Sequence, residues 1–219
     1  ACHMQPDLEL GRGTVVTGDA EKFWAPVEMR DMGAVKRHDF LGGHKDMMGN
    51  AASLSIETRK VQNVLNVKVG VENVNTGHHL PTGIAIRNLL LLVTPVLANG
   101  DTLTHIGDTR VPEYGGMGPV EEGNYAGYPG KGFALIFGDD KGNTRVMDWN
   151  ATRIVEDTRI KAKATDISTY SFALPANPGP ITIHTRLIYR RAFKPLADIK
   201  KWDLEDIPVA SDMTTITLR

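Results

Sequence analysis

The sequence VLNVKVGVENV, residues 64–74, has the clearest pattern in the chain. Apolar side chains at positions 65, 67, 69 and 71 alternate with Asn, Lys, Gly and Glu. Successive side chains of an extended strand point to opposite faces, so this alternation predicts a β-strand with one buried and one solvated face.

Similar segments follow along the chain. Six of them are predicted to be strands: 84–97, 101–106 with His105, 132–137, 165–175, 181–191 and 213–219. Asn99–Gly100 predicts a two-residue hairpin turn after the first of these. In 181–191 the alternation puts His184, Arg186 and Arg190 on the face opposite the apolar set, so we expect His184 at the surface. Residues 195–202 are the one late segment with a helical pattern.

Seven or eight strands joined by Gly- and Pro-rich turns predict a mainly β fold, an antiparallel immunoglobulin-like β-sandwich over residues 53–219. Residues 1–52 lack this alternation and are expected to form a separate, irregular and partly helical segment. The glycine-rich stretch 108–131 predicts a long loop, and such loops in compact domains are usually functional or mobile.

Composition excludes several classes of function. The 25 basic and 26 acidic residues give a formal net charge of −1, which argues against a nucleic-acid partner or an anionic membrane surface. The longest apolar run, NLLLLVTPVLA, is too short to span a bilayer, so we expect no transmembrane segment. A single cysteine excludes an internal disulfide and a cysteine-rich zinc site.

Cys2 and His3 lie next to each other in ACHMQPDL, residues 1–8. Covalent haem attachment uses the motif C-x-x-C-H, in which two thiols bind the haem and the adjacent histidine ligates the iron. ACH corresponds to the last three letters of that motif. The alternative is an accidental pair, because any short motif has false positives.

Further histidines lie in two loops. KRHDFLGGHK contains His38 and His44 among basic residues, which suits either a second iron ligand facing haem propionates or a solvated basic loop. VNTGHHLPTG contains His78 and His79 in a predicted turn. Neighbouring residues of an extended chain point apart, so at most one of this pair is expected to ligate a metal; the other reading is a purely structural turn.

Signatures of a hydrolytic enzyme are missing. The sequence has no G-x-S-x-G motif, Cys2 has no context of a catalytic nucleophile, and no carboxylate pair can be singled out for acid–base chemistry. We therefore expect no hydrolytic activity.

Taken in order, CHMQ, RHDFLGGH, VENVNTGHHLPTG, WNATRIVEDTRI and TRLIYRRAF resemble the C-terminal part of periplasmic multihaem c-type cytochromes. The resemblance covers nearly the whole chain, although only the haem motif is chemically specific. It implies that Cys2 is the second thioether cysteine and His3 the proximal iron ligand. His38 would be the leading distal ligand, with His44 a further iron candidate and His78 a weaker cofactor-binding one.

The family's first haem cysteine and its other haem motifs are absent from this sequence. The chain is therefore expected to be the C-terminal portion of a larger cytochrome, with two alternatives for the chain alone: it carries haem c, or it carries none.

The resemblance implies a periplasmic or extracellular protein of electron transfer, whose partners are redox proteins or an upstream haem domain. The sandwich would serve as a docking or shielding module, and whether the parent is a carrier or a multihaem oxidoreductase stays open. The alternatives are a haem-free immunoglobulin-like binding module that contacts a partner through the loop 108–131, and a metal-binding protein that uses His78 or His79.

Overall fold

The computed structural model describes residues 43–218. The chain divides into two compact units, Ala1–Gly43 and His44–Arg219, and the architecture below is that of the second. The predicted irregular segment at the start of the chain falls mostly outside the described residues. The short helix α1, Lys45–Met48, precedes the first strand.

The smaller of two antiparallel sheets has three strands in the order β1-β2-β6. They span Ala52–Val61 (β1), Val64–Asn73 (β2) and Thr165–Ala173 (β6). The central strand β2 is the alternating segment predicted above, and its residues 65, 67, 69 and 71 are fully buried. Tyr170 and Phe172 of β6 lie on the same inner face.

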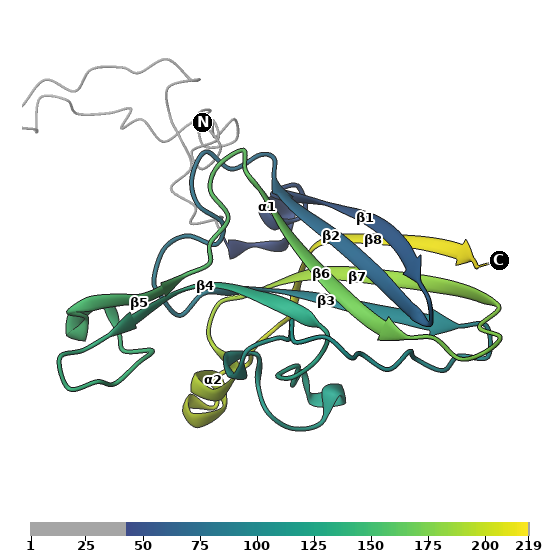
Figure 1. The fold of residues 1–219 in the computed structure, drawn as a ribbon. Coiled ribbons are helices and arrows are strands. Elements are labelled where there is room, and N and C mark those ends of the chain that lie inside the picture. The colour runs from purple at the N-terminus through teal and green to yellow at the C-terminus, as the bar shows by residue number, and fades with distance from the viewer. Residues whose placement is uncertain (1–42, 219) are drawn as a thin grey trace, which may run out of the picture. The chain divides into compact units, whose positions relative to one another are not determined.

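The larger sheet has five strands in the order β5-β4-β3-β7-β8 (Figure 1). Their bounds are Asn88–Leu97 (β3), Gly130–Gly138 (β4), Arg153–Asp157 (β5), Pro180–Arg190 (β7) and Ile207–Thr217 (β8). The eight strands in the described part of the chain form two facing antiparallel sheets, which confirms the predicted mainly β sandwich.

The main core fills the space between the sheets, where apolar burial supplies most of the stability of such a fold. The largest fully buried apolar side chains in it are Leu65, Leu89, Leu91, Phe133, Tyr170, Phe172, Ile181, Ile183 and Leu187.

A second apolar cluster lies on the outer face of the five-stranded sheet. There the loop 108–131 and the helix α2, Lys194–Lys200, cover one half of the sheet, as Figure 1 shows for α2 below β3 and β4. The loop contains two short 3-10 turns, Glu113–Gly115 (η5) and Val120–Glu122 (η6). Close packing explains Gly132 of β4, because a Cβ at this position would collide with the Tyr114 hydroxyl.

The turn after β3 differs from its prediction. The Leu97 N–H donates to the Asp101 carbonyl at 2.8 Å, which closes a loop that includes Ala98 as well as Asn99 and Gly100. Gly100 has φ +92°, a conformation that suits glycine. The two-residue hairpin expected from Asn99–Gly100 was therefore one residue too short.

The chain then crosses from one sheet to the other. The Leu103 N–H donates to the Pro95 carbonyl of β3, and the Ala173 N–H of β6 donates to the Thr104 carbonyl. His105 and Phe172 form a β-bridge. Residues 101–106, called the strap from here on, therefore join the two sheets along one side of the sandwich.

Candidate functional site

The turn between β2 and β3 holds His78 and is organised by Asn73, whose side chain is fully buried. The Asn73 amide donates to the carbonyls of His78 (2.9 Å) and Ile160 (3.1 Å). Its amide oxygen accepts the N–H and the hydroxyl of Thr76. One buried amide thus fixes the backbone of the turn and ties it to the chain that leads into β6.

The imidazole ring of His78 is half-buried, and its Nδ1 lies 2.9 Å from the His79 carbonyl oxygen. A carbonyl oxygen can only accept, so Nδ1 carries a proton and the lone pair of the neutral ring lies on Nε2. Histidines that bind metals commonly have this arrangement, because the hydrogen bond fixes the tautomer and the ring orientation. The chemistry of His78 therefore fits an iron-ligating imidazole.

His44 lies at the start of α1, and its side chain is exposed. Its carbonyl accepts the N–H groups of Met47 (3.1 Å) and Met48 (3.0 Å), so its backbone begins the helix. The short link from α1 to β1 is joined to the His78 turn: the Asn75 amide donates to the Asn50 carbonyl, and the Val74 N–H donates to that of Ala51. The segments that carry His44 and His78 are therefore neighbours.

The other predicted site residues, Cys2, His3 and His38, lie outside the described residues. Within residues 43–218, no three His, Cys, Asp or Glu side chains are grouped so that they could hold a metal ion. A haem iron takes only one or two ligands from the protein, so this finding does not bear on haem ligation.

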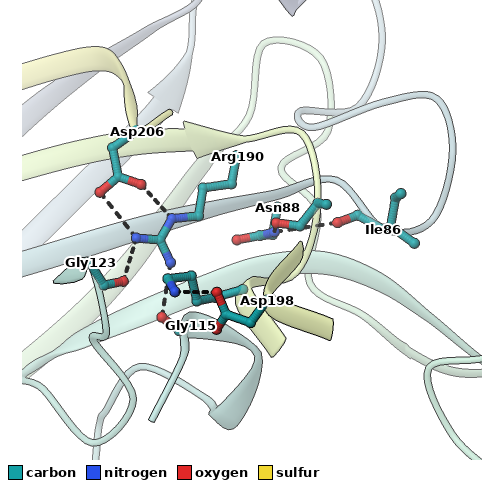
Figure 2. A network of polar contacts seen from close by, with 9 residues as sticks. Ile86, Asn88, Gly115, Gly123, Arg190, Asp198 and Asp206 are labelled. Atoms are coloured by element: carbon teal, nitrogen blue, oxygen red, sulfur yellow. Dashed lines mark hydrogen bonds and ion pairs between the residues drawn. The ribbon is translucent and has the colours of Figure 1, made fainter. Parts of the chain in front are cut away.

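Sequence reasoning misplaced Arg190. It was expected on the polar face of its strand, but its side chain is only 1% exposed. Its guanidinium forms a two-pronged ion pair with Asp206 and donates to the carbonyls of Gly115 (2.9 Å) and Gly123 (2.6 Å), as Figure 2 shows. All five N–H donors of a guanidinium point in fixed directions, which suits such a set of acceptors.

The same guanidinium lies 5.0 Å from the centre of the Tyr125 ring, a favourable cation–π distance. Burial, reinforced by the charge of Asp206, raises the pKa of the Tyr125 hydroxyl. Arg190 therefore joins β7 to both 3-10 turns of the loop 108–131 and to the segment before β8. This is a structural brace, and it explains why the glycine-rich loop is packed against the sheet.

His105 was also missed, apart from its place in an extended segment. Its ring packs against Phe172, with ring centres 5.1 Å apart, and against Tyr170 at 6.1 Å. Both ring nitrogens are buried, and neither has a hydrogen-bond partner among the residues described. His184, by contrast, is exposed on β7 as predicted. The burial of the His105 ring could not be predicted from the sequence, because the strap is too short to show a periodic pattern of apolar residues.

The fold and its turns define the class of molecule: a two-sheet antiparallel β-sandwich with a histidine-bearing turn at one end. No family model matches the sequence, and no curated protein matches it.

Solved structures do match. A penta-heme cytochrome c552 from Thermochromatium tepidum superimposes with a TM-score of 0.62 and 21% sequence identity, over 95% of this chain and 49% of that chain. A structural-genomics target, SoR45, gives a TM-score of only 0.32 at 8% identity, over 75% of this chain and 85% of that chain. The first similarity establishes a shared fold. This chain spans about half the length of that cytochrome.

None of the described helices is long and apolar enough to cross a membrane.

Proposed function

We propose that this chain is the C-terminal β-sandwich part of an extracytoplasmic multihaem c-type cytochrome that takes part in electron transfer. The observation that carries the proposal is the fold shared with the penta-heme cytochrome over 95% of this chain. The order of the sequence motifs, from Cys2–His3 to the TRLIYRRAF strand, supports it independently.

In this proposal Cys2 forms a thioether bond to a c-type haem and His3 ligates its iron. His38 is the leading distal ligand, and His44 and His78 are the further candidates. A bound haem c would supply a one-electron redox centre whose potential depends on its ligands, its burial and nearby charge. His78 fits such a role because the His79 carbonyl holds its ring with the lone pair on Nε2.

The sandwich would act beside the haem as a docking or shielding module, with redox proteins or the remaining half of the parent cytochrome as partners. The apolar core between the two sheets gives such a module a stable body of its own. The site of action would be periplasmic or extracellular, where c-type haems of this family are found.

The test is an intact mass together with a reduced-minus-oxidised visible spectrum, on the full chain from a host that attaches haem. The expected result is a mass increase of one haem and sharp low-spin bands, both lost in Cys2→Ser. His38→Gln, His44→Gln and His78→Gln would then identify the distal ligand through loss of the low-spin bands, with His79→Gln as the matched control. A colourless protein at the bare-chain mass would contradict haem attachment and favour a haem-free binding module.

A further inference from the structure

One half of the outer face of the five-stranded sheet is left uncovered by residues 43–218. The loop 108–131 and α2 cover the half around Leu90 and Ile188. Further along the strands, Thr94 of β3 lies opposite His184 of β7, which in turn lies opposite Met213 of β8. His184 is exposed and Met213 is 61% exposed, so this row of side chains faces solvent.

A depression of about 620 Å³ lies where the covered half meets the bare half. This volume is in the range of small-molecule sites. Its lining combines polar and apolar surface in similar amounts, from Thr94, Tyr128, His184, Thr185, Arg186, Ser211, Asp212 and Met213. A second depression, of about 290 Å³, shares Thr94 and Tyr128 with the first and includes Arg110.

Two arginines lie on this surface. The exposed side chain of Arg186 makes no hydrogen bond or ion pair with any part of the chain that the structure describes. His184 is two residues away on the same side of β7, about 7 Å along the strand. Arg110 donates to the carbonyls of Gly127, His105 and Gly107 and has no carboxylate partner in residues 43–218.

Two carboxylates lie near these side chains, and one of them, Asp212, is in the lining of the depression. Asp206 is paired with the buried Arg190, and Asp212 accepts the N–H of Met213 at 2.8 Å. Thr94, Ser211 and Tyr128, whose hydroxyl groups can donate hydrogen bonds, line the same depression as Arg186 and His184. An unpaired guanidinium beside an imidazole and several hydroxyls is the donor set that an oxyanion requires, because it offers charge and directed N–H and O–H groups together.

We propose that this surface binds an oxyanion, a phosphate or carboxylate group, through Arg186 and His184, with Tyr128 as the wall of the site. Arg186 would hold two oxygens with its forked N–H groups, and His184 would supply a further donor. The proposal uses only residues of the sandwich and stands whether or not the chain carries haem.

The experiment is an NMR titration of the full chain at low ionic strength and about pH 6. Sodium phosphate and sodium acetate are added in separate arms, each against sodium chloride at matched ionic strength. The observed signals are the Arg186 side-chain N–H and the His184 ring C–H. The ring signal is assigned by its loss from the spectrum of His184→Gln. We expect saturable shifts of both signals with one or both oxyanions, and the arm that saturates at lower concentration identifies the preferred group.

Arg186→Gln should weaken the binding about tenfold, the effect of losing one charge-assisted, two-pronged contact. Both Arg186 and the matched control Arg59, on β1 of the other sheet, are exposed, so neither substitution should disturb folding. Arg59→Gln should bind as the unmodified chain does. The proposal would be overturned if sodium chloride shifted the two signals as much as the oxyanions do. It would also be overturned if Arg186→Gln and Arg59→Gln weakened the binding equally.

Discussion

At the scale of single residues, the partly buried ring of His105 should make the stability of the fold depend on pH. Desolvation lowers its pKa below the ordinary 6.5, the charge of Arg110 adds to the shift, and the charge of Asp108 opposes it. The rings of Tyr170 and Phe172 pack against it from β6. Protonation would place a second N–H donor on a ring whose buried nitrogens have no acceptor within the described structure.

The unfolded chain therefore binds this proton more readily than the folded chain. The stability that neutral His105 contributes should be fully present above pH 6.5 and should be lost as the pH falls through the lowered pKa. We expect His105→Phe, which keeps the ring contacts, to flatten the fall in urea midpoint between about pH 7.5 and 5.5. His184→Gln is the control on an exposed histidine. If the urea midpoint of His105→Phe falls as much as that of the unmodified chain, another group is responsible for the pH dependence.

Arg190 is the residue whose replacement should cost the most. Arg190→Met leaves the Asp206 carboxylate and the carbonyls of Gly115 and Gly123 without their donor. Removing one partner of a buried ion pair typically costs about 3–5 kcal/mol, and Asp206 is partly exposed, so we expect about 3 kcal/mol in urea unfolding. Arg190→Lys should also lose stability because an ammonium cannot reproduce the fork.

Hydrogen exchange gives the more specific check on Arg190. In Arg190→Lys the amides of the two 3-10 turns, η5 and η6, should exchange faster, while those of β2 should change little. Arg186→Gln, an exposed arginine four residues away on the same strand, is the matched control. Unchanged exchange in η5 and η6 would mean that apolar packing alone holds the loop.

At the scale of the elements, period-2 alternation predicted the strands that have one buried and one open face. It predicted β2, β6 and most of β7 because their inner residues contact the core and their outer residues meet solvent or polar groups. The alternation gave a wrong prediction where both faces of a strand are covered. In β7 the residues from Leu187 to Arg190 are all buried, because the loop 108–131 covers the outer face there. The position of Arg190 on that outer face therefore predicted exposure, although the side chain is buried.

Two other strands show the same limit. All five residues of the edge strand β5 are exposed, so the alternation that marks a strand is absent. The strand β8 begins at Ile207, six residues before the predicted segment at Met213. Its first residues were not predicted, because a proline such as Pro208 within a run of residues argues against a strand. For the site, the turn that holds His78 was predicted, but its organising residue Asn73 was not, since hydrogen bonds to Ile160 across 87 residues leave no local pattern.

The turn between β2 and β3 should depend on that one amide. Asn73→Ala leaves the carbonyls of His78 and Ile160 without their buried donor, for an expected loss of about 3 kcal/mol in urea unfolding. It should also release the His78 backbone, seen as faster exchange of the amides at 76–80. The control is Asn63→Ala, an exposed asparagine in the turn between β1 and β2. Equal stability of the two variants would contradict the role given to Asn73.

At the scale of the whole molecule, the unit His44–Arg219 contains the entire described core. The sequence-based boundary after residue 52 stays a prediction, and its position matters. Met48 and Ala51 belong to the core between the sheets, at 4% and 2% exposure. The carbonyl of Ala51 also accepts the N–H of Val74, so residues before β1 help to hold the His78 turn.

Two truncated chains separate these boundaries. A chain that begins at residue 44 should unfold in one cooperative transition at nearly the urea midpoint of the full chain, because every core contact described above is kept. A chain that begins at residue 53 loses Met48, Ala51 and Ala52 from the core, and burial of a side chain such as methionine contributes about 1.5–3 kcal/mol. It should therefore be less stable by about 3 kcal/mol. Equal midpoints for the two chains would instead place the start of the folding unit at β1, as the sequence pattern predicts.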